Sequence, residues 1–135
     1  MKIDRKSLRS KRKLPTMNKT KLIDKIVSTA KEKGAERIAA KTKNTEKPIG
    51  LGYKGSRVNF VPDVVAYYPN KRDLFSIEEK MVKSKLPEMI SKWILFSLEA
   101  RKRKGKFYLM VPEKNEASFA QIISEKQISA ELRAV

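Results

Sequence analysis

The spacing of apolar and polar residues along this chain changes between a helical period and an extended one. Apolar residues recur three and four positions apart over residues 18–33, which predicts a helix that stops at Gly34. A longer, broadly apolar segment over residues 87–104 predicts a second helix that packs across a sheet. A third helix is expected over residues 116–125, with Asn115 as its cap.

Segments with the composition of strands lie between these helices. Residues 60–68 and 74–80 are separated by the turn-forming residues 69–73, and together they predict a β-hairpin. Residues 37–42 predict an earlier strand, and the apolar run over residues 107–111 predicts a central strand buried on both faces. The resulting order is helix, strand, two hairpin strands, helix, strand, helix. This order predicts an α/β domain with a mixed β-sheet flanked by helices.

Composition narrows the classes of function. The 135 residues suffice for one domain, and 40% of them are hydrophobic. The 32 Lys and Arg outnumber the 15 acids, and a net charge of +17 indicates a polyanionic partner. The absence of Cys and His excludes zinc ribbons, thiol chemistry and an imidazole base. No apolar run approaches the roughly 18 residues of a membrane span, so we expect no membrane contact and a soluble, cytoplasmic protein.

The positive charge is concentrated before the last predicted strand. Residues 1–15 hold seven Lys or Arg and one acid, and we expect a disordered basic arm ahead of a single domain over residues 16–135. Either a phosphate-binding arm or a solubilising tail accounts for this composition. Thirteen cations are predicted to contact nucleic acid: Arg5, Lys6, Lys11, Arg12, Lys13, Lys54, Arg57, Lys83, Lys85, Arg101, Lys102, Arg103 and Lys104.

Ionisable residues on the predicted hairpin suggest a chemical site. Asp63 lies near the start of its first strand. Glu78 and Lys80 lie two residues apart on the second strand, so strand alternation places Glu78 and Lys80 on one face with Ser76. Two carboxylates, with the backbone carbonyl of Glu79, offer the oxygen ligands that Mg²⁺ prefers, with Mn²⁺ as a substitute. The hairpin therefore predicts a metal site with an adjacent lysine.

The sequence Pro62-Asp63, followed by Glu78-Glu79-Lys80, resembles the motif of the PD-(D/E)xK nuclease superfamily. The resemblance covers roughly residues 17–125 as a pattern of elements, and the five motif positions are its specific part. It implies a restriction-endonuclease-like core in the order αβββαβα. It also implies a Mg²⁺-dependent DNA endonuclease in which Asp63, Glu78 and Glu79 hold the metal. Asp63, Glu78 and Lys80 would be catalytic, with Lys80 beside the attacking water.

The small single-domain members with basic tails, the archaeal-type Holliday-junction resolvases, are the nearest look-alikes. They imply a structure-specific cut in branched DNA and a homodimer, for which this sequence carries no independent signal. In some relatives an acid of the first helix joins the metal site. Asp24, Glu32 and Glu36 are the candidates for that position here.

Other interpretations stay open at this point. Asp63 could cap a turn, while Glu78 and Lys80 form a solvated face of an edge strand. The chain would then be a non-catalytic, basic nucleic-acid-binding protein, or a structural subunit of a ribonucleoprotein. Trp93 is predicted to be a core residue rather than a base-stacking platform.

Overall fold

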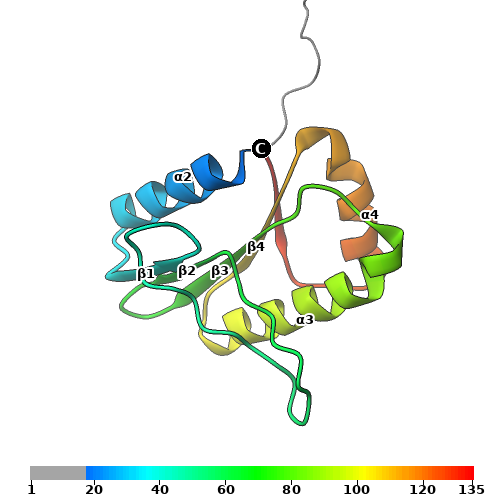
Figure 1. The fold of residues 1–135 in the computed structure, drawn as a ribbon, viewed down its shortest axis with the longest axis horizontal. Helices are drawn as coiled ribbons and strands as arrows, with labels where there is room; N and C mark the ends of the chain where they lie inside the picture. The colour runs from blue at the N-terminus through cyan, green and yellow to red at the C-terminus, as the bar shows by residue number, and fades with distance from the viewer. Residues whose placement is uncertain (1–17) are drawn as a thin grey trace, which may run out of the picture.

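A computed structural model describes residues 18–135, in which a five-stranded mixed sheet carries helices on both faces (Figure 1). The α/β class is confirmed, and the predicted basic arm lies outside the described residues. In chain order the elements are α2 (Lys19–Glu32), β1 (Arg37–Ala40), β2 (Val64–Tyr67), β3 (Arg72–Ile77), the 3-10 turn η1 (Lys83–Lys85), α3 (Leu86–Lys102), β4 (Phe107–Val111), the 3-10 turn η2 (Glu113–Asn115), α4 (Glu116–Glu125) and β5 (Glu131–Ala134).

The strands lie side by side in sequence order, from β1 to β5. β1, β2 and β3 pair antiparallel, whereas β4 and β5 run parallel to their preceding neighbours. Parallel neighbours need a crossover connection, which α3 and α4 supply. β5 was not predicted, because its sequence Glu-Leu-Arg-Ala lacks the β-branched residues of a typical strand. It forms because α4 returns the chain to the free edge of β4.

The predicted hairpin is present, with Val64 opposite Phe75 and Tyr67 opposite Arg72. The predicted end of its second strand was wrong, because β3 stops at Ile77 and the Glu-Glu-Lys triplet follows it. The backbone N–H of Glu78 still donates to the Met110 carbonyl, at 3.0 Å. Beyond that bond the chain leaves the sheet to enter η1 and begin the crossover to β4.

The helices follow the predicted bounds closely. Asn18 caps α2 by accepting a hydrogen bond from the Lys21 backbone N–H at 3.0 Å, and the helix ends just before Gly34. Asn115 precedes α4 as expected, but its side chain does not cap the helix. Its Nδ2 donates instead to the Glu79 carbonyl, at 3.2 Å. Within residues 18–135, no helix is both long enough and apolar enough to cross a membrane.

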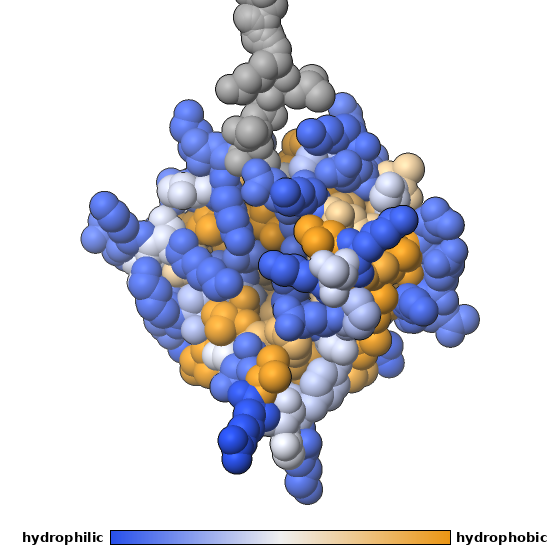
Figure 2. Space-filling model, turned by 45° about the vertical axis from the view of Figure 1, so that its right-hand side comes forward, coloured by the Kyte–Doolittle hydropathy of each residue, from blue (hydrophilic) through white to orange (hydrophobic). Residues whose placement is uncertain are grey.

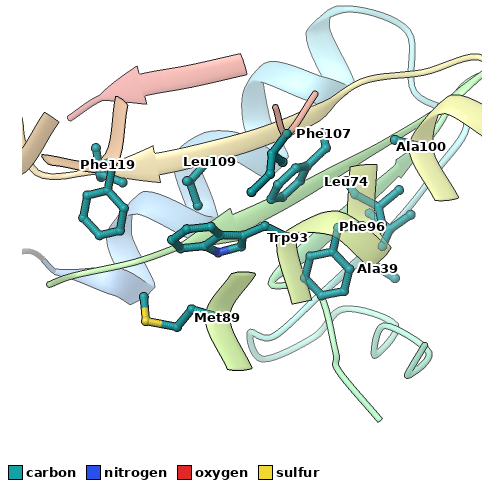
Figure 3. Packing of buried hydrophobic residues seen from close by; sticks show 12 residues of the cluster. Ala39, Leu74, Met89, Trp93, Phe96, Ala100, Phe107, Leu109 and Phe119 are labelled. Carbon is teal, nitrogen blue, oxygen red and sulfur yellow. The ribbon is translucent and has the colours of Figure 1, made fainter. Parts of the chain in front are cut away.

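The main core lies between the sheet and the helices α3 and α4 (Figure 3). Trp93 has none of its surface exposed, which confirms its assignment to the core, and its ring centroid lies 5.8 Å from that of Phe119. α2 covers the opposite face of β1 and β2. Tyr108 and Met110 are only half-buried, because they line a cavity of about 720 Å³ between α2 and the sheet. The prediction that β4 is buried on both faces was therefore wrong.

Candidate active site

Asp63 lies immediately before β2 and is locked against the end of β3. Its backbone N–H donates to the Phe75 carbonyl at 2.9 Å, so the register of the hairpin continues and places Asp63 across from Ser76. Its side-chain Oδ2 accepts a hydrogen bond from the Ile77 backbone N–H at 2.7 Å. Only 4% of the residue is exposed. The carboxylate is therefore held at a fixed position at one end of the sheet.

The other oxygen of this carboxylate, Oδ1, is not satisfied in the same way. The ammonium groups of Lys19 and Lys41 lie 3.2 and 3.4 Å from it, within ion-pair distance. Neither approaches in hydrogen-bonding geometry, and within residues 18–135 Oδ1 is the one buried side-chain polar atom without a hydrogen-bond partner. The two half-exposed lysines balance the charge of Asp63 but leave a directional acceptor site unfilled.

Glu78 is positioned by the main core. Its Oε2 accepts hydrogen bonds from Trp93 Nε1 at 3.0 Å and from Ser76 Oγ at 3.4 Å, and it pairs with the Lys92 ammonium at 2.6 Å. A buried indole N–H needs an acceptor, and Glu78 supplies it. Ser76 and Glu78 are therefore in contact. Glu78 and Lys80 both follow the end of β3, so strand alternation does not place either of them.

A cavity of about 290 Å³ opens beside Glu78, between the first turn of α2 and the start of α3. Four lysines and three glutamates line it: Lys19, Lys80, Lys85, Lys92, Glu78, Glu79 and Glu88. Asp63 does not line the cavity, but its carboxylate contacts two residues that do, Lys19 and Ile77. The fold thus brings Asp63, Glu78 and Lys80 to one end of the sheet, around a cavity whose lysines attract anions.

The remaining predicted metal ligands are placed less favourably. Glu79 is exposed, and its carbonyl already accepts the hydrogen bond from Asn115. The described part of the chain contains no group of three or more acidic side chains placed to hold a metal. The first-helix candidates Asp24, Glu32 and Glu36 are all exposed, and none of them lines the cavity. The α2 residue beside Asp63 is a cation, Lys19, rather than an acid.

The predicted nucleic-acid-binding cations fall into separate groups. Lys83 and Lys85 form η1, next to the cavity. Arg101, Lys102, Arg103 and Lys104 lie at the far end of α3, roughly 25 Å away at about 1.5 Å per residue. Lys54 and Arg57 are exposed in the connection between β1 and β2. The five arm cations lie outside the described residues. Hydrophilic side chains cover much of the face in Figure 2, with apolar areas between them.

Three site residues were missed from the sequence: Lys19, Lys41 and Lys92. None of the three had a signal in the sequence, because their contacts with Asp63 and Glu78 join segments that only the tertiary structure brings together. No protein-family model, curated protein or solved structure matches this chain. The resemblance to the nuclease superfamily therefore depends on the five motif residues and on the order of the elements.

Proposed function

We propose that this protein is a Mg²⁺-dependent DNA endonuclease that hydrolyses phosphodiester bonds at the cavity beside Glu78. The observation that carries the proposal is the Asp63 carboxylate, which is buried, fixed by the Ile77 N–H, and left with one oxygen that lacks a hydrogen-bond partner. Lys19 and Lys41 balance the charge of this carboxylate, and a ligand that coordinates Oδ1 would fill its free acceptor position.

Asp63 and Glu78 have the ligand chemistry that a hard divalent cation requires. Mg²⁺ is commonly held by one or two carboxylates, with water and substrate phosphate filling its other positions, so Asp63 and Glu78 would suffice. When bound, the ion would polarise a phosphoryl oxygen and lower the pKa of a bound water. Lys19 has to release Asp63 for this to happen, and a half-exposed lysine on the first turn of a helix can move into solvent.

The chain's own side chains supply the rest of the site. Lys80, Lys85 and Lys92 line the cavity and would hold the phosphate backbone there. Trp93 and Ser76 orient Glu78, and the Ile77 N–H orients Asp63. As a fixed positive charge beside the phosphate, Lys80 would stabilise the negative charge that develops during hydrolysis.

The sheet supports the proposal through its order of elements. We propose that it is a restriction-endonuclease-like core, with β5 as an added edge strand. Two features depart from the expected motif: the Glu-Glu-Lys triplet follows β3 instead of ending it, and Ser76 occupies the position across from Asp63. A homodimer, with one site for each of two strands, remains a prediction from the resemblance to the resolvases.

A non-catalytic nucleic-acid-binding protein is the second candidate, and one observation favours it. Each of the two acids is already paired with lysine, Asp63 with Lys19 and Lys41, and Glu78 with Lys92. In such a protein the acids would organise a surface of lysines that binds phosphates, and no metal would be needed.

Cleavage of branched, duplex and single-stranded DNA with Mg²⁺ or Mn²⁺ separates the two candidates. An endonuclease nicks at least one of these substrates, and Asp63→Asn lowers the rate by about 10²–10³-fold or more, the loss typical of removing one group that stabilises charge in an active site. Asp73→Asn is the matched control, since Asp73 is equally buried but lies away from the cavity.

Binding in EDTA completes the test. Asp63→Asn and Glu78→Gln should bind DNA at least as tightly as the wild type, because each removes a negative charge near the phosphates. Cleavage that survives in Asp63→Asn would contradict the assignment of Asp63 to the active site. Absence of cleavage on every substrate, together with intact binding, would favour the binding protein.

A further inference from the structure

Residues 49–60, which we call the β1–β2 hairpin, project past α3 and away from the sheet (Figure 1). Leu51 and Phe60 exchange both of their backbone hydrogen bonds, each at 2.7 Å, so the two arms of the segment run antiparallel. The segment is therefore a narrow hairpin that stands out from the body of the protein.

Several contacts give this hairpin a defined shape. The Tyr53 hydroxyl donates to the Ser91 carbonyl of α3 at 2.6 Å, and the Ser56 N–H closes the turn on the Tyr53 carbonyl at 2.9 Å. The arms approach so closely at Gly52 that an added Cβ would lie 2.8 Å from Asn59 Oδ1 and 2.9 Å from the Val58 carbonyl. Glycine at this position is what allows the arms to meet.

The surface of the hairpin combines apolar side chains with cations. Ile49 is 69% exposed and Val58 is 51% exposed, and Tyr53 joins them among the few large apolar residues exposed in the described chain. Lys54 and Arg57 lie between them in sequence, and residues 47–62 contain no acid. The lower end of the molecule in Figure 2 shows blue and pale side chains with orange ones between them. Aliphatic groups held in water beside cations are typical of a surface that binds an anionic partner with an apolar interior.

The hairpin is also connected to the candidate active site. Its anchor, Ser91, directly precedes Lys92, which pairs with Glu78, and Trp93, which donates to Glu78. The Tyr53 hydroxyl is the donor in this anchor to α3. A ligand that engages the hairpin is therefore held against the same helix that positions Glu78.

We propose that the β1–β2 hairpin is a wedge that inserts Val58, which lies on the turn side of the Leu51–Phe60 pair, between bases of DNA whose stacking is already interrupted at a nick or gap. This inference rests on the proposed function, because it names the substrate class of that site. Lys54 and Arg57 would hold the flanking phosphates. Apolar wedges of this kind unstack a base step at a cost of a few kcal/mol, and the cost is least where a neighbouring base is already unpaired or unstacked. A second copy of this basic chain offers no charge complementarity to Lys54 and Arg57, and neither does its own basic arm.

The test is binding of the full chain, in EDTA, to a nicked duplex and to a continuous duplex of the same sequence, each with 2-aminopurine beside the nick position. The wild type should prefer the nicked duplex by about tenfold and raise the fluorescence of the probe as its base unstacks. The variant Val58→Ser should bind both duplexes to within about twofold of each other and leave the fluorescence unchanged.

Two controls isolate the wedge. Leu98→Ser removes an apolar side chain that is 50% exposed on α3, and should leave both the preference and the fluorescence as in the wild type. Lys54→Gln/Arg57→Gln should weaken binding to both duplexes equally, and lower the salt slope of log K by about 0.9 for each phosphate that is no longer neutralised. Circular dichroism of each variant checks that the fold is retained.

A Val58→Ser variant that keeps the preference and the fluorescence change would overturn the wedge, and so would a wild type that binds both duplexes equally or binds neither. Because no metal is present, the result is independent of cleavage. A preference for nicked DNA without any cleavage would reject the endonuclease and retain the wedge. Cleavage together with no effect of Val58→Ser on the preference would reject the wedge and retain the endonuclease.

Discussion

Two aspartates stand at opposite ends of the β2–β3 hairpin and are buried to the same degree, Asp63 at 4% exposure and Asp73 at 3%. Asp73 accepts one backbone hydrogen bond and forms one ion pair with a lysine. Its Oδ1 accepts a hydrogen bond from the Lys106 N–H at 2.9 Å, and its Oδ2 lies 3.4 Å from the Lys71 ammonium. Asp63 accepts one backbone hydrogen bond through Oδ2, while Oδ1 has lysines nearby but no hydrogen bond within the described residues.

The difference shows how burial alone fails to identify a functional acid. Asp73 fastens the start of β4 to the start of β3, in a place so tight that a Cβ on Gly105 would lie 2.0 Å from the Arg72 carbonyl. Asp63 has the same burial and the same kind of backbone bond, and its second oxygen also lies within ion-pair distance of lysine. The difference is that this oxygen, Oδ1, is fully buried and accepts no hydrogen bond within the described residues. The unused acceptor, rather than the buried charge, separates a candidate ligand from a structural residue.

The largest expected effect concerns Trp93, which donates a hydrogen bond to Glu78, the second candidate acid of the site. Trp93→Ala should lower the free energy of unfolding by about 3–5 kcal/mol, because it removes the largest buried side chain of the main core. Trp93→Phe retains much of that packing and removes only the donor to Glu78, so it should cost less and should change DNA cleavage more than its stability change explains. Chemical denaturation and nicking assays measure the two effects. A Trp93→Ala variant with wild-type stability and lost DNA affinity would make Trp93 a stacking residue instead.

Alanine at each aspartate tests the comparison directly. Asp73→Ala leaves the Lys106 N–H without its acceptor and should cost about 1–3 kcal/mol of unfolding free energy. Asp63→Ala also removes an acceptor, from Ile77, but it eliminates the unsatisfied Oδ1 at the same time, so it should cost about 1 kcal/mol less than Asp73→Ala. Urea denaturation of the two variants is the measurement. Equal losses would indicate that Oδ1 is satisfied after all.

Lys19 allows a smaller but sharper test of why Asp63 differs. If its ammonium occupies the place of a metal ion, Lys19→Gln should lower the Mg²⁺ concentration for half-maximal cleavage by about two- to fivefold, the scale of an ion pair with a half-exposed lysine. Lys71→Gln, which removes the corresponding lysine from Asp73, is the matched control and should leave the Mg²⁺ requirement unchanged. A rise in the requirement for Lys19→Gln would mean that Lys19 assists the site.

The smallest effect is expected at an exposed acid, Glu46, which pairs with Arg37. Its hydrogen bonds with the Arg37 guanidinium lower the pKa of Glu46 below the ordinary value of 4.5 and raise that of Arg37. A lowered folded-state pKa contributes stability above the unfolded pKa and loses it as the pH falls through the folded value. The small difference in melting temperature between the wild type and Glu46→Gln should therefore be present at pH 7 and vanish in acid. High salt should also reduce it. A melting-temperature difference that grows in acid would show that the pairing with Arg37 does not lower the pKa of Glu46.

Much of the fold followed from local sequence. The apolar face of α2, with Ile23, Ile26 and Val27 inward, is set by helical spacing, and the turn residues between β2 and β3 fix the hairpin. The bounds of β4 and α4 were also predicted correctly. β5 was missed because its pairing comes from the free edge of β4 and not from its own composition.

The candidate site was likewise predictable from the sequence only in part. The sequence by itself determined the excess of positive charge, the exclusion of His and Cys chemistry, and the placement of Asp63 and Glu78 near a hairpin. Only the tertiary structure decided that β3 ends before Glu78, that Trp93 holds Glu78, and that Lys19 approaches Asp63. The reason is physical. Periodicity and turn chemistry act between residues close in the chain, whereas each of these contacts joins residues that only the packing of helices on the sheet brings together.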